Sequence, residues 1–325
     1  MLASWIERRA SFRTAALCGP CPQPSRISVF QHRHQEPKVP KNLPCLLLCL
    51  TTTLGLGATA QAAEWSDTAL SWRAGNDYRE PFNPDDIKKN IFAITHASGY
   101  KYGSNFVNLD FLLSDSKDPG ALGKTSGAQE AYLVYRNTID IGKVRGSDIK
   151  FGPVRGVGVT LGFDVNTKND VGYNSRKRML VAGPTLMWDV PGFFNTSLLL
   201  LRESNAPSGA FPPISQVTGR YTYKTHAMLT GAWAIPLSPL FSFEGFFNLI
   251  DSKGKDEVGR DTAVETNIDM QVMYDVGAAL GSAKNTFRVG LEYQYWKNKF
   301  GNSAATTGNV GQTARTPMIR AEYHF

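Results

Sequence analysis

The stretch TPMIRAEYHF, residues 316–325, ends the chain on an aromatic residue and alternates in character along its length. One face carries Pro317, Ile319, Ala321, Tyr323 and Phe325. The other face carries Met318, Arg320, Glu322 and His324. In an outer-membrane β-barrel such a segment is the closing strand, with one face in lipid and the terminal Phe at the interface. The stretch therefore predicts a barrel, provided that the same alternation recurs upstream.

The alternation does recur along most of the chain. Every second residue of 157–165 and of 287–295 is apolar, and the residues between them are polar or glycine. Strict alternation is typical of a strand with one apolar face, and residues 63–325 show no convincing helical periodicity. Twelve strands are predicted, at about 68–75, 90–98, 105–114, 129–139, 155–167, 176–188, 192–204, 217–235, 240–250, 262–276, 285–297 and 314–325. The segment 217–235 is long for one strand and is expected to bend near residues 225–226 or to form two. The predicted fold class is all-β: a transmembrane antiparallel β-barrel of about 12 strands.

The connections between these strands alternate in length. Strands 2–3, 6–7, 8–9 and 10–11 are joined by short turns, whereas most of the alternate joins are long and rich in polar residues and glycine. Short turns on one rim and long loops on the other are the usual arrangement of an outer-membrane barrel. The long join at 140–154 is an exception on the short-turn side. An aromatic girdle is expected near the short-turn rim, formed by Trp188, Phe193, Trp233, Phe241, Phe287, Tyr323 and Phe325.

Residues 1–62 are expected to be an N-terminal extension followed by a cleaved signal peptide. Two lysines precede an apolar run at 43–56, and Ala60-Gln61-Ala62 supplies the small residues that a signal peptidase needs. The barrel then occupies residues 63–325, placed in the outer membrane of a Gram-negative bacterium after secretion across the inner membrane. Its C-terminal strand, ending at Phe325, is the segment that we expect the barrel-assembly machinery to recognise.

Removal of this leader changes the chemistry of the chain. All four cysteines lie in residues 1–62, so the redox-like spacing of Cys18 and Cys21 falls in a segment that is removed. The leader also holds seven Lys/Arg and two Asp/Glu, and without it the net charge falls from +7 to +2. A charge that small does not favour nucleic-acid binding. No cofactor and no metal site are expected.

The polar faces of the predicted strands would line the lumen of the barrel. Candidate solute-binding residues there are Asn108, Asp110, Glu130, Tyr132, Asp164, Glu244, Phe246, Asp269, Arg288, Glu292 and Trp296. Twelve strands give a narrower lumen than the general porins of about sixteen strands. A narrow, polar lumen with a few aromatics suits a small polar solute with a flat ring, since aromatics stack on rings and Asn, Asp and Glu bind hydroxyls. The sequence thus predicts a passive diffusion channel and no enzyme.

Several segments resemble a known family. They include Thr95-His-Ala-Ser-Gly-Tyr-Lys-Tyr-Gly103, Gly162-Phe-Asp164, Pro191-Gly-Phe193 and Tyr293-Gln-Tyr-Trp-Lys-Asn-Lys-Phe-Gly301. This pattern is similar to that of the Tsx-like, nucleoside-specific channel-forming outer-membrane proteins, in the branch called outer envelope proteins, and it spans residues 63–325. The resemblance implies a twelve-stranded monomeric barrel that passes nucleosides and deoxynucleosides. It assigns no nucleoside-contacting residue by position.

Other interpretations are open at this point. The chain could be a non-specific small porin, or a soluble β-sandwich that buries the same apolar faces; the sandwich leaves the export signal and Phe325 unexplained. His96-Ala97-Ser98 has the His-x-Ser spacing of outer-membrane lipid hydrolases, with His as base and Ser as nucleophile. Alternation puts both residues on the lipid-facing side, near a short turn, and no third orienting residue is evident.

Overall fold

The computed structural model describes residues 63–123 and 125–325. The predicted signal peptide and the Cys18–Cys21 spacing lie outside these residues. In the described part, no helix is long and apolar enough to cross a membrane.

Twelve long strands make up the fold, and they follow one another along the chain with short helical segments between some of them. The strands are β1 (Trp65–Tyr78), β2 (Ile87–Tyr100), β3 (Gly103–Ser114), β4 (Gln129–Asp140), β5 (Val154–Asn169), β6 (Arg178–Trp188), β7 (Phe193–Asn205), β9 (His226–Pro236), β10 (Phe241–Ile250), β11 (Glu265–Asp275), β12 (Phe287–Lys297) and β13 (Ala314–His324). The short elements are α1 (Ile141–Arg145), η1 (Ile214–Gln216), β8 (Tyr221–Thr222), α2 (Val276–Ala279), η2 (Lys299–Gly301) and α3 (Ala304–Thr307).

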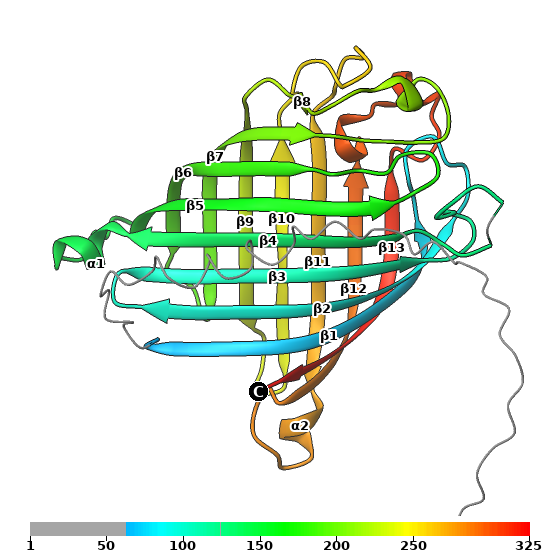
Figure 1. The fold of residues 1–325 in the computed structure, drawn as a ribbon. Coiled ribbons are helices and arrows are strands. Elements are labelled where there is room, and N and C mark those ends of the chain that lie inside the picture. The colour runs from blue at the N-terminus through cyan, green and yellow to red at the C-terminus, as the bar shows by residue number, and fades with distance from the viewer. Residues whose placement is uncertain (1–62, 124) are drawn as a thin grey trace, which may run out of the picture. The chain divides into compact units, whose positions relative to one another are not determined.

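The twelve long strands close on themselves in an antiparallel barrel (Figure 1). Each pairs with its sequence neighbour, β7 pairs with both β6 and β9, and β1 pairs with β13. At the closing seam, Ala69 lies opposite His324 and Gly75 lies opposite Met318. Closure gives every long strand two neighbours and removes the open sheet edge that would otherwise expose unpaired backbone groups. The predicted fold class is confirmed.

The outer wall of the barrel is apolar. Large hydrophobic side chains such as Leu180, Leu200 and Leu291 are exposed by 61%, 63% and 71% on this face. Their neighbours one position along each strand point inward, because successive side chains of a strand lie on opposite faces of the sheet. A soluble protein of this size would bury such a surface, whereas a barrel in a bilayer presents it to the acyl chains.

The two rims of the barrel differ in their connections. On one rim, here called the turn rim, residues 101–102, 189–192 and 237–240 form tight turns. The other rim, here called the loop rim, carries the segments 79–86, 115–128, 170–177, 206–225, 251–264 and 298–313. Two turn-rim joins are longer and hold α1 and α2. The join at 140–154 was expected to be long, but the α2 join was expected to be a short turn.

The long segment predicted at 217–235 is two strands. Only β8 forms in its first part, where it pairs with the end of β7, and the full strand β9 begins at His226. Residues 223–225 leave the sheet, and Tyr223 and Lys224 bond instead to the backbone of Glu203 and Lys253. The other predicted strands are present, with ends that differ by a few residues.

Aromatic side chains gather at the turn rim, as predicted. Ring pairs are found between Trp188 and Phe194, with centroids 6.0 Å apart, and between Trp233 and Phe243, at 5.5 Å. Phe241 with Tyr274 and Tyr323 with Phe325 form further pairs there. Phe325 remains 71% exposed. This band is the aromatic girdle expected where a barrel meets the membrane–water interface.

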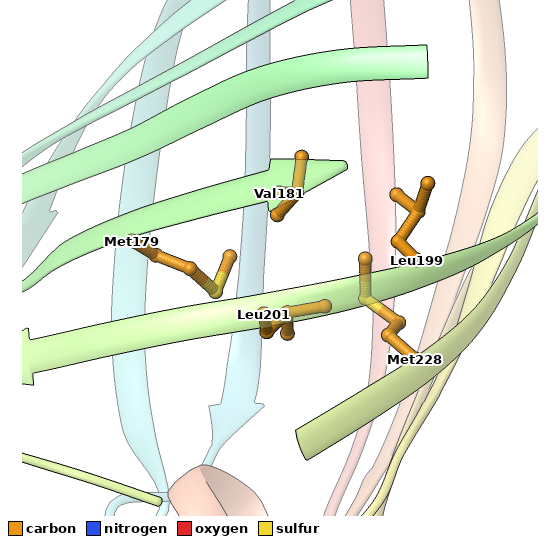
Figure 2. Close-up of a cluster of buried hydrophobic side chains, with 5 residues drawn as sticks. All are labelled: Met179, Val181, Leu199, Leu201 and Met228. Carbon is orange, nitrogen blue, oxygen red and sulfur yellow. The ribbon is translucent and has the colours of Figure 1, made fainter. Parts of the chain in front are cut away.

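The interior is not polar throughout, which the sequence analysis did not anticipate. Two apolar clusters lie on the inner wall. The first is formed by Met179, Val181, Leu199, Leu201 and Met228 of β6, β7 and β9, with Ile250 packed against it (Figure 2). The second is formed by Tyr78, Ile87, Ile91 and Met318 of β1, β2 and β13, with Leu112 packed against it. In the strand order of the barrel these two clusters lie on opposite walls, so they narrow the polar part of the lumen.

Candidate functional site

The eleven predicted lumen residues all point into the barrel. The strand register shows this, because directly paired residues share a face. Asp110 pairs with Tyr132, Phe246 with Asp269, and Arg288 with Glu322. The rest follow by the two-residue period of their strands: Asn108, Glu130, Asp164, Glu244, Glu292 and Trp296. The sequence therefore predicted the facing of these residues correctly.

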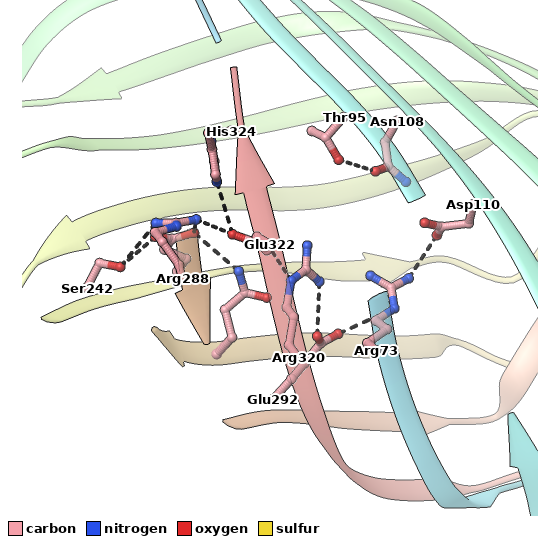
Figure 3. A network of polar contacts seen from close by, with 12 residues as sticks. Arg73, Thr95, Asn108, Asp110, Ser242, Arg288, Glu292, Arg320, Glu322 and His324 are labelled. Carbon is pink, nitrogen blue, oxygen red and sulfur yellow. Dashed lines mark hydrogen bonds and ion pairs between the residues drawn. The ribbon is translucent and has the colours of Figure 1, made fainter. Parts of the chain in front are cut away.

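Four of these eleven residues belong to one continuous chain of ion pairs (Figure 3). In order around the wall, this ion-pair chain runs Glu244, Arg288, Glu322, Arg320, Glu292, Arg73 and Asp110. It alternates in sign at every step and crosses β10, β12, β13, β1 and β3. The Arg320–Glu292 and Arg73–Asp110 contacts are 3.0 and 2.9 Å long, and the Arg73–Glu292 contact is 3.7 Å long.

This arrangement leaves the wall slightly negative. Each of the three arginines has two carboxylate partners, and four carboxylates share them. Asp269 adds a fifth carboxylate close by, and its side chain accepts a hydrogen bond of 3.2 Å from Gln294. An arginine with two carboxylates has little attraction left for an anionic solute, since its positive charge is already offset by theirs. The ion-pair chain thus favours neutral or cationic solutes.

The inner wall formed by β4–β7 also carries a row of uncharged hydroxyl groups. The hydroxyl groups of Thr138, Thr160, Thr185 and Ser197 are linked one to the next over 2.8, 2.5 and 2.7 Å. This hydroxyl chain was not predicted from the sequence as a unit. Thr and Ser occur on either face of a strand, so only the register shows that the four lie side by side. The hydroxyl chain presents groups that both donate and accept hydrogen bonds.

Near the hydroxyl chain, three predicted residues form a local cluster. Arg136 donates to Asp164 over 2.5 Å, and the Tyr132 hydroxyl donates to the same carboxylate over 3.0 Å. Glu130 accepts from the amide of Asn166 over 2.7 Å. These contacts hold the charges of this wall in place and leave no unpaired arginine at this point of the lumen.

A third part of the inner wall combines aromatic and amide side chains. This amide wall consists of Phe246, Asn248, Asn267, Asp269, Gln294 and Trp296, which share the inner face of β10, β11 and β12. The Oδ1 atom of Asn267 is buried and has no hydrogen-bond partner. Buried polar atoms are normally paired, with protein groups or with water. The amide wall therefore holds a buried acceptor that no group of the described residues satisfies.

Trp296 makes more contacts with other side chains than was expected from the sequence. Its Nε1 donates to Glu265 over 2.6 Å, and the Nζ of Lys299 lies 4.6 Å from the ring centroid. Phe300 packs edge-on at 5.1 Å. The cation covers a face of the indole that was expected to be available for stacking, so Phe246 is the less encumbered aromatic residue of the amide wall.

At the loop rim, Glu80 is the centre of a buried cluster. It accepts a hydrogen bond from Lys89 over 2.5 Å and one from Lys299 over 3.2 Å, and it lies 3.7 Å from Lys168. Asp118 shares Lys89 and Lys168. Burial alone would raise the pKa of Glu80, but the three ammonium groups outweigh burial and hold that pKa well below its ordinary value of 4.5. The cluster ties the β1–β2 loop to the loops that follow β3 and β12.

A second cluster ties the remaining loops together. Both Tyr173 and Tyr223 donate their hydroxyl protons to Glu257, the latter over 2.6 Å. Burial is the main cause that raises the pKa of both tyrosines above the ordinary value, and the charge of Glu257 raises both further. Lys253 pairs with the buried Glu203 over 2.9 Å. The loops after β5, β7 and β10 are therefore held against one another over the loop rim.

The His-x-Ser pair lies where the sequence placed it but is not assembled for catalysis. His96 and Ser98 are on the outer face of β2, close to the turn rim. The Nδ1 of His96 is hydrogen-bonded to the hydroxyl of Thr68 over 2.8 Å. Ser98 is buried, and among the described residues no hydrogen bond links it to His96. The same part of the chain contains no group of three or more His, Cys, Asp or Glu residues arranged to hold a metal ion.

Comparisons with known proteins give structural matches only. No family model and no curated protein matches this chain. Among solved structures, the KdgM porin is 9% identical, with 79% of this chain and 99% of that chain covered and a TM-score of 0.37. The NanC porin is 11% identical, with 78% and 98% covered and a TM-score of 0.42. The translocator domain of the autotransporter NalP from Neisseria meningitidis is 11% identical, with 82% and 90% covered and a TM-score of 0.42. Likeness this low carries no argument about function, and the class of the protein rests on its own geometry: a closed twelve-stranded β-barrel, apolar outside and charged inside.

Proposed function

We propose that this protein is an outer-membrane channel through which small, polar, uncharged solutes, nucleosides above all, diffuse passively. The observation that carries the proposal is the amide wall, where Phe246 shares the inner face of β10–β12 with the amide side chains of Asn248, Asn267 and Gln294. A nucleoside has a flat base that stacks on an aromatic ring and sugar hydroxyls that donate to amide and carboxylate oxygens.

The charge arrangement supports the same solute class. The ion-pair chain saturates the three arginines with carboxylates, which disfavours phosphorylated or carboxylated solutes. The hydroxyl chain across β4–β7 offers uncharged groups that both donate and accept hydrogen bonds. Weak interactions of this kind suit a channel, because a solute must leave as readily as it enters.

The membrane placement is part of this proposal. The apolar outer wall and the aromatic girdle at the turn rim fit a bilayer, and the tight turns would face the periplasm while the long loops face outward. On this view the C-terminal strand β13, followed by Phe325, is the segment presented to the barrel-assembly machinery.

A planar-bilayer measurement with a matched pair of variants tests the solute site. Adenosine or thymidine, added in the millimolar range, is expected to reduce the single-channel current of the refolded protein. Phe246→Ala should weaken this block, and Phe247→Ala should leave it unchanged, because Phe247 is the adjacent residue on the outer wall. Arg136→Ala should have a smaller effect than Phe246→Ala, since it removes no ring.

The outcomes separate the alternatives. A current that is indifferent to nucleosides would reduce the protein to a general small porin. Equal losses of block in the Phe246 and Phe247 variants would show that the effect comes from altered folding and that the amide wall is not the binding surface.

A further inference from the structure

Four arginines form a patch on the outer wall that the channel does not use. Arg176, Arg178, Arg202 and Arg220 are all exposed, at the loop-rim ends of β6 and β7 and in the adjoining loops. Six other arginines of the described residues form ion pairs, whereas none of these four does so. A cluster of like charges without counter-charges is costly to maintain, unless it binds an anion.

The strand register brings the arginines of this patch together. Arg178 lies opposite Ser204, and Leu180 lies opposite Arg202. Arg178 and Arg202 are therefore diagonal neighbours on one face, with backbone positions about 7–8 Å apart. Arg220 donates to the carbonyl of Arg176 over 2.9 Å and to the hydroxyl of Ser204 over 3.3 Å. Partial burial, and then the charges of Arg178 and Arg176, lower the pKa of Arg220.

An apolar strip continues from the patch towards the turn rim. Leu180, Leu198 and Leu200 follow on the same outer face, and they are exposed by 61%, 56% and 63%. A cavity of about 450 Å³ lies where the two surfaces meet. Its outward lining includes Phe163, Arg178, Leu180, Arg202 and Ser204, with Thr222 of β8. The surface therefore changes from cationic to apolar within one or two strand residues.

The two carboxylates of the cavity lining do not neutralise this patch. Glu203 and Asp164 belong to the strands that line the cavity, but both point into the barrel. Glu203 is paired there with Lys253 over 2.9 Å, and Asp164 is paired with Arg136 over 2.5 Å. The positive charge of the patch is thus available to a ligand that approaches from outside the barrel.

We propose that this patch binds the phosphate group of a phosphorylated lipid in the membrane leaflet that the loop rim faces. Guanidinium groups bind phosphate through pairs of parallel hydrogen bonds, and clustered basic residues at a membrane surface recognise anionic headgroups. The acyl chains of the lipid then lie along Leu180, Leu198 and Leu200. The inference rests on the membrane placement proposed above but concerns a different surface from the solute pathway.

The test uses the full-length protein purified in detergent and analysed by native mass spectrometry. The probes are diphosphoryl lipid A, the same lipid with its phosphates removed, and inorganic phosphate. Wild type should retain the diphosphoryl lipid and lose the dephosphorylated one. Arg178→Gln/Arg202→Gln should bind the diphosphoryl lipid at least about tenfold more weakly, since it removes charge-assisted hydrogen bonds.

The matched control is Arg315→Gln, because Arg315 is also exposed at the loop end of a strand, on the outer face of β13. It should bind the lipid as wild type does. Equal binding of the two lipids, an equal loss in the Arg315 variant, or an unaffected double variant would overturn the proposal. Displacement of the lipid by millimolar inorganic phosphate would also overturn it, by assigning the patch to a free anion.

Channel activity separates this proposal from the proposed function. The double variant should keep the wild-type single-channel conductance, because both arginines lie on the outer wall. Specific lipid binding by a protein without conductance would refute the channel and leave the lipid site standing. Conductance without phosphate-dependent lipid binding would refute the lipid site and leave the channel standing.

Discussion

At the scale of single residues, Arg73, Arg288 and Arg320 set the charge of the lumen, because each lies between two carboxylates. Wild-type channels should accordingly be weakly cation-selective. The selectivity for cations should increase in the Arg288→Gln variant and decrease in the Glu292→Gln variant. One uncompensated unit charge on the wall interacts with a monovalent ion 4 Å away by about 1 kcal/mol in water. The ratio of cation to anion permeability should therefore change by roughly fivefold. Reversal potentials in a KCl gradient measure this ratio.

The control for the selectivity prediction is Arg315→Gln, whose arginine faces outward and should not affect the reversal potential. An anion-selective wild type would contradict the account of the ion-pair chain, since it would mean that the arginines act on the permeating ions in spite of their partners.

Glu80 is the residue on which the loop-rim cluster depends. Glu80→Gln would leave Lys299 without its ion-pair partner and is expected to destabilise the folded barrel by about 3–5 kcal/mol, the usual cost of breaking a buried pair from one side. Urea unfolding in lipid vesicles measures the difference. Glu64→Gln is the control: its pair with Lys143 is 3.2 Å long but half-exposed, and such pairs contribute about 0–1 kcal/mol.

The contribution of Glu80 should also depend on pH in a defined direction. The folded-state pKa lies below the ordinary value of 4.5. A depressed carboxyl pKa stabilises the fold above the unfolded-state value, and this stabilisation is lost as pH falls through the folded-state pKa. The difference between wild type and Glu80→Gln should therefore be constant above pH 4.5 and shrink in more acid solution. A difference that grows on acidification would contradict the role given to this residue.

At the scale of elements, the β1–β13 seam is what closes the barrel. Residues 63–325 contain no cysteine, so no native thiol can form disulfides with engineered cysteine pairs. Ala74→Cys with Ile319→Cys should form a disulfide in the refolded protein, because these positions are directly opposed. Ala74→Cys with Arg320→Cys should not, since the two side chains point to opposite faces. Gel mobility after mild oxidation distinguishes the pairs, and efficient cross-linking of the second pair alone would place the seam in another register.

The sequence predicted these elements well where alternation was strict. The inward facing of Asp110, Asp269 and Glu292 follows from the two-residue period alone. The run Leu198–Leu201 carries no such information, because apolar residues occupy both faces, and the inward position of Leu199 and Leu201 was missed.

Side-chain contacts between strands could not be predicted from the sequence either. The ion-pair chain depends on contacts between strands that are not neighbours in the sequence, such as β10 with β12 and β1 with β12. The hydroxyl chain depends on the register of the consecutive strands β4 to β7. A shift of one residue in any of these pairings would separate the partners. Residue types and periods predict which side chains face inward, and only the closed sheet determines which of them meet.

At the scale of the whole molecule, the barrel has an apolar exterior and an interior crowded by paired charges, hydroxyls and two apolar clusters. Its conductance should therefore lie well below that of a porin of about sixteen strands in the same bilayer. Single-channel recording of both proteins checks this, and an equal or larger conductance would contradict the crowded lumen.

Uptake into proteoliposomes tests the central claim most directly. Labelled thymidine should equilibrate across vesicles that contain the refolded protein, without an ion gradient or ATP, and thymidine monophosphate should enter far more slowly because the lumen arginines are already paired. Vesicles with correctly folded protein that admit neither compound faster than empty vesicles would contradict the proposed pathway.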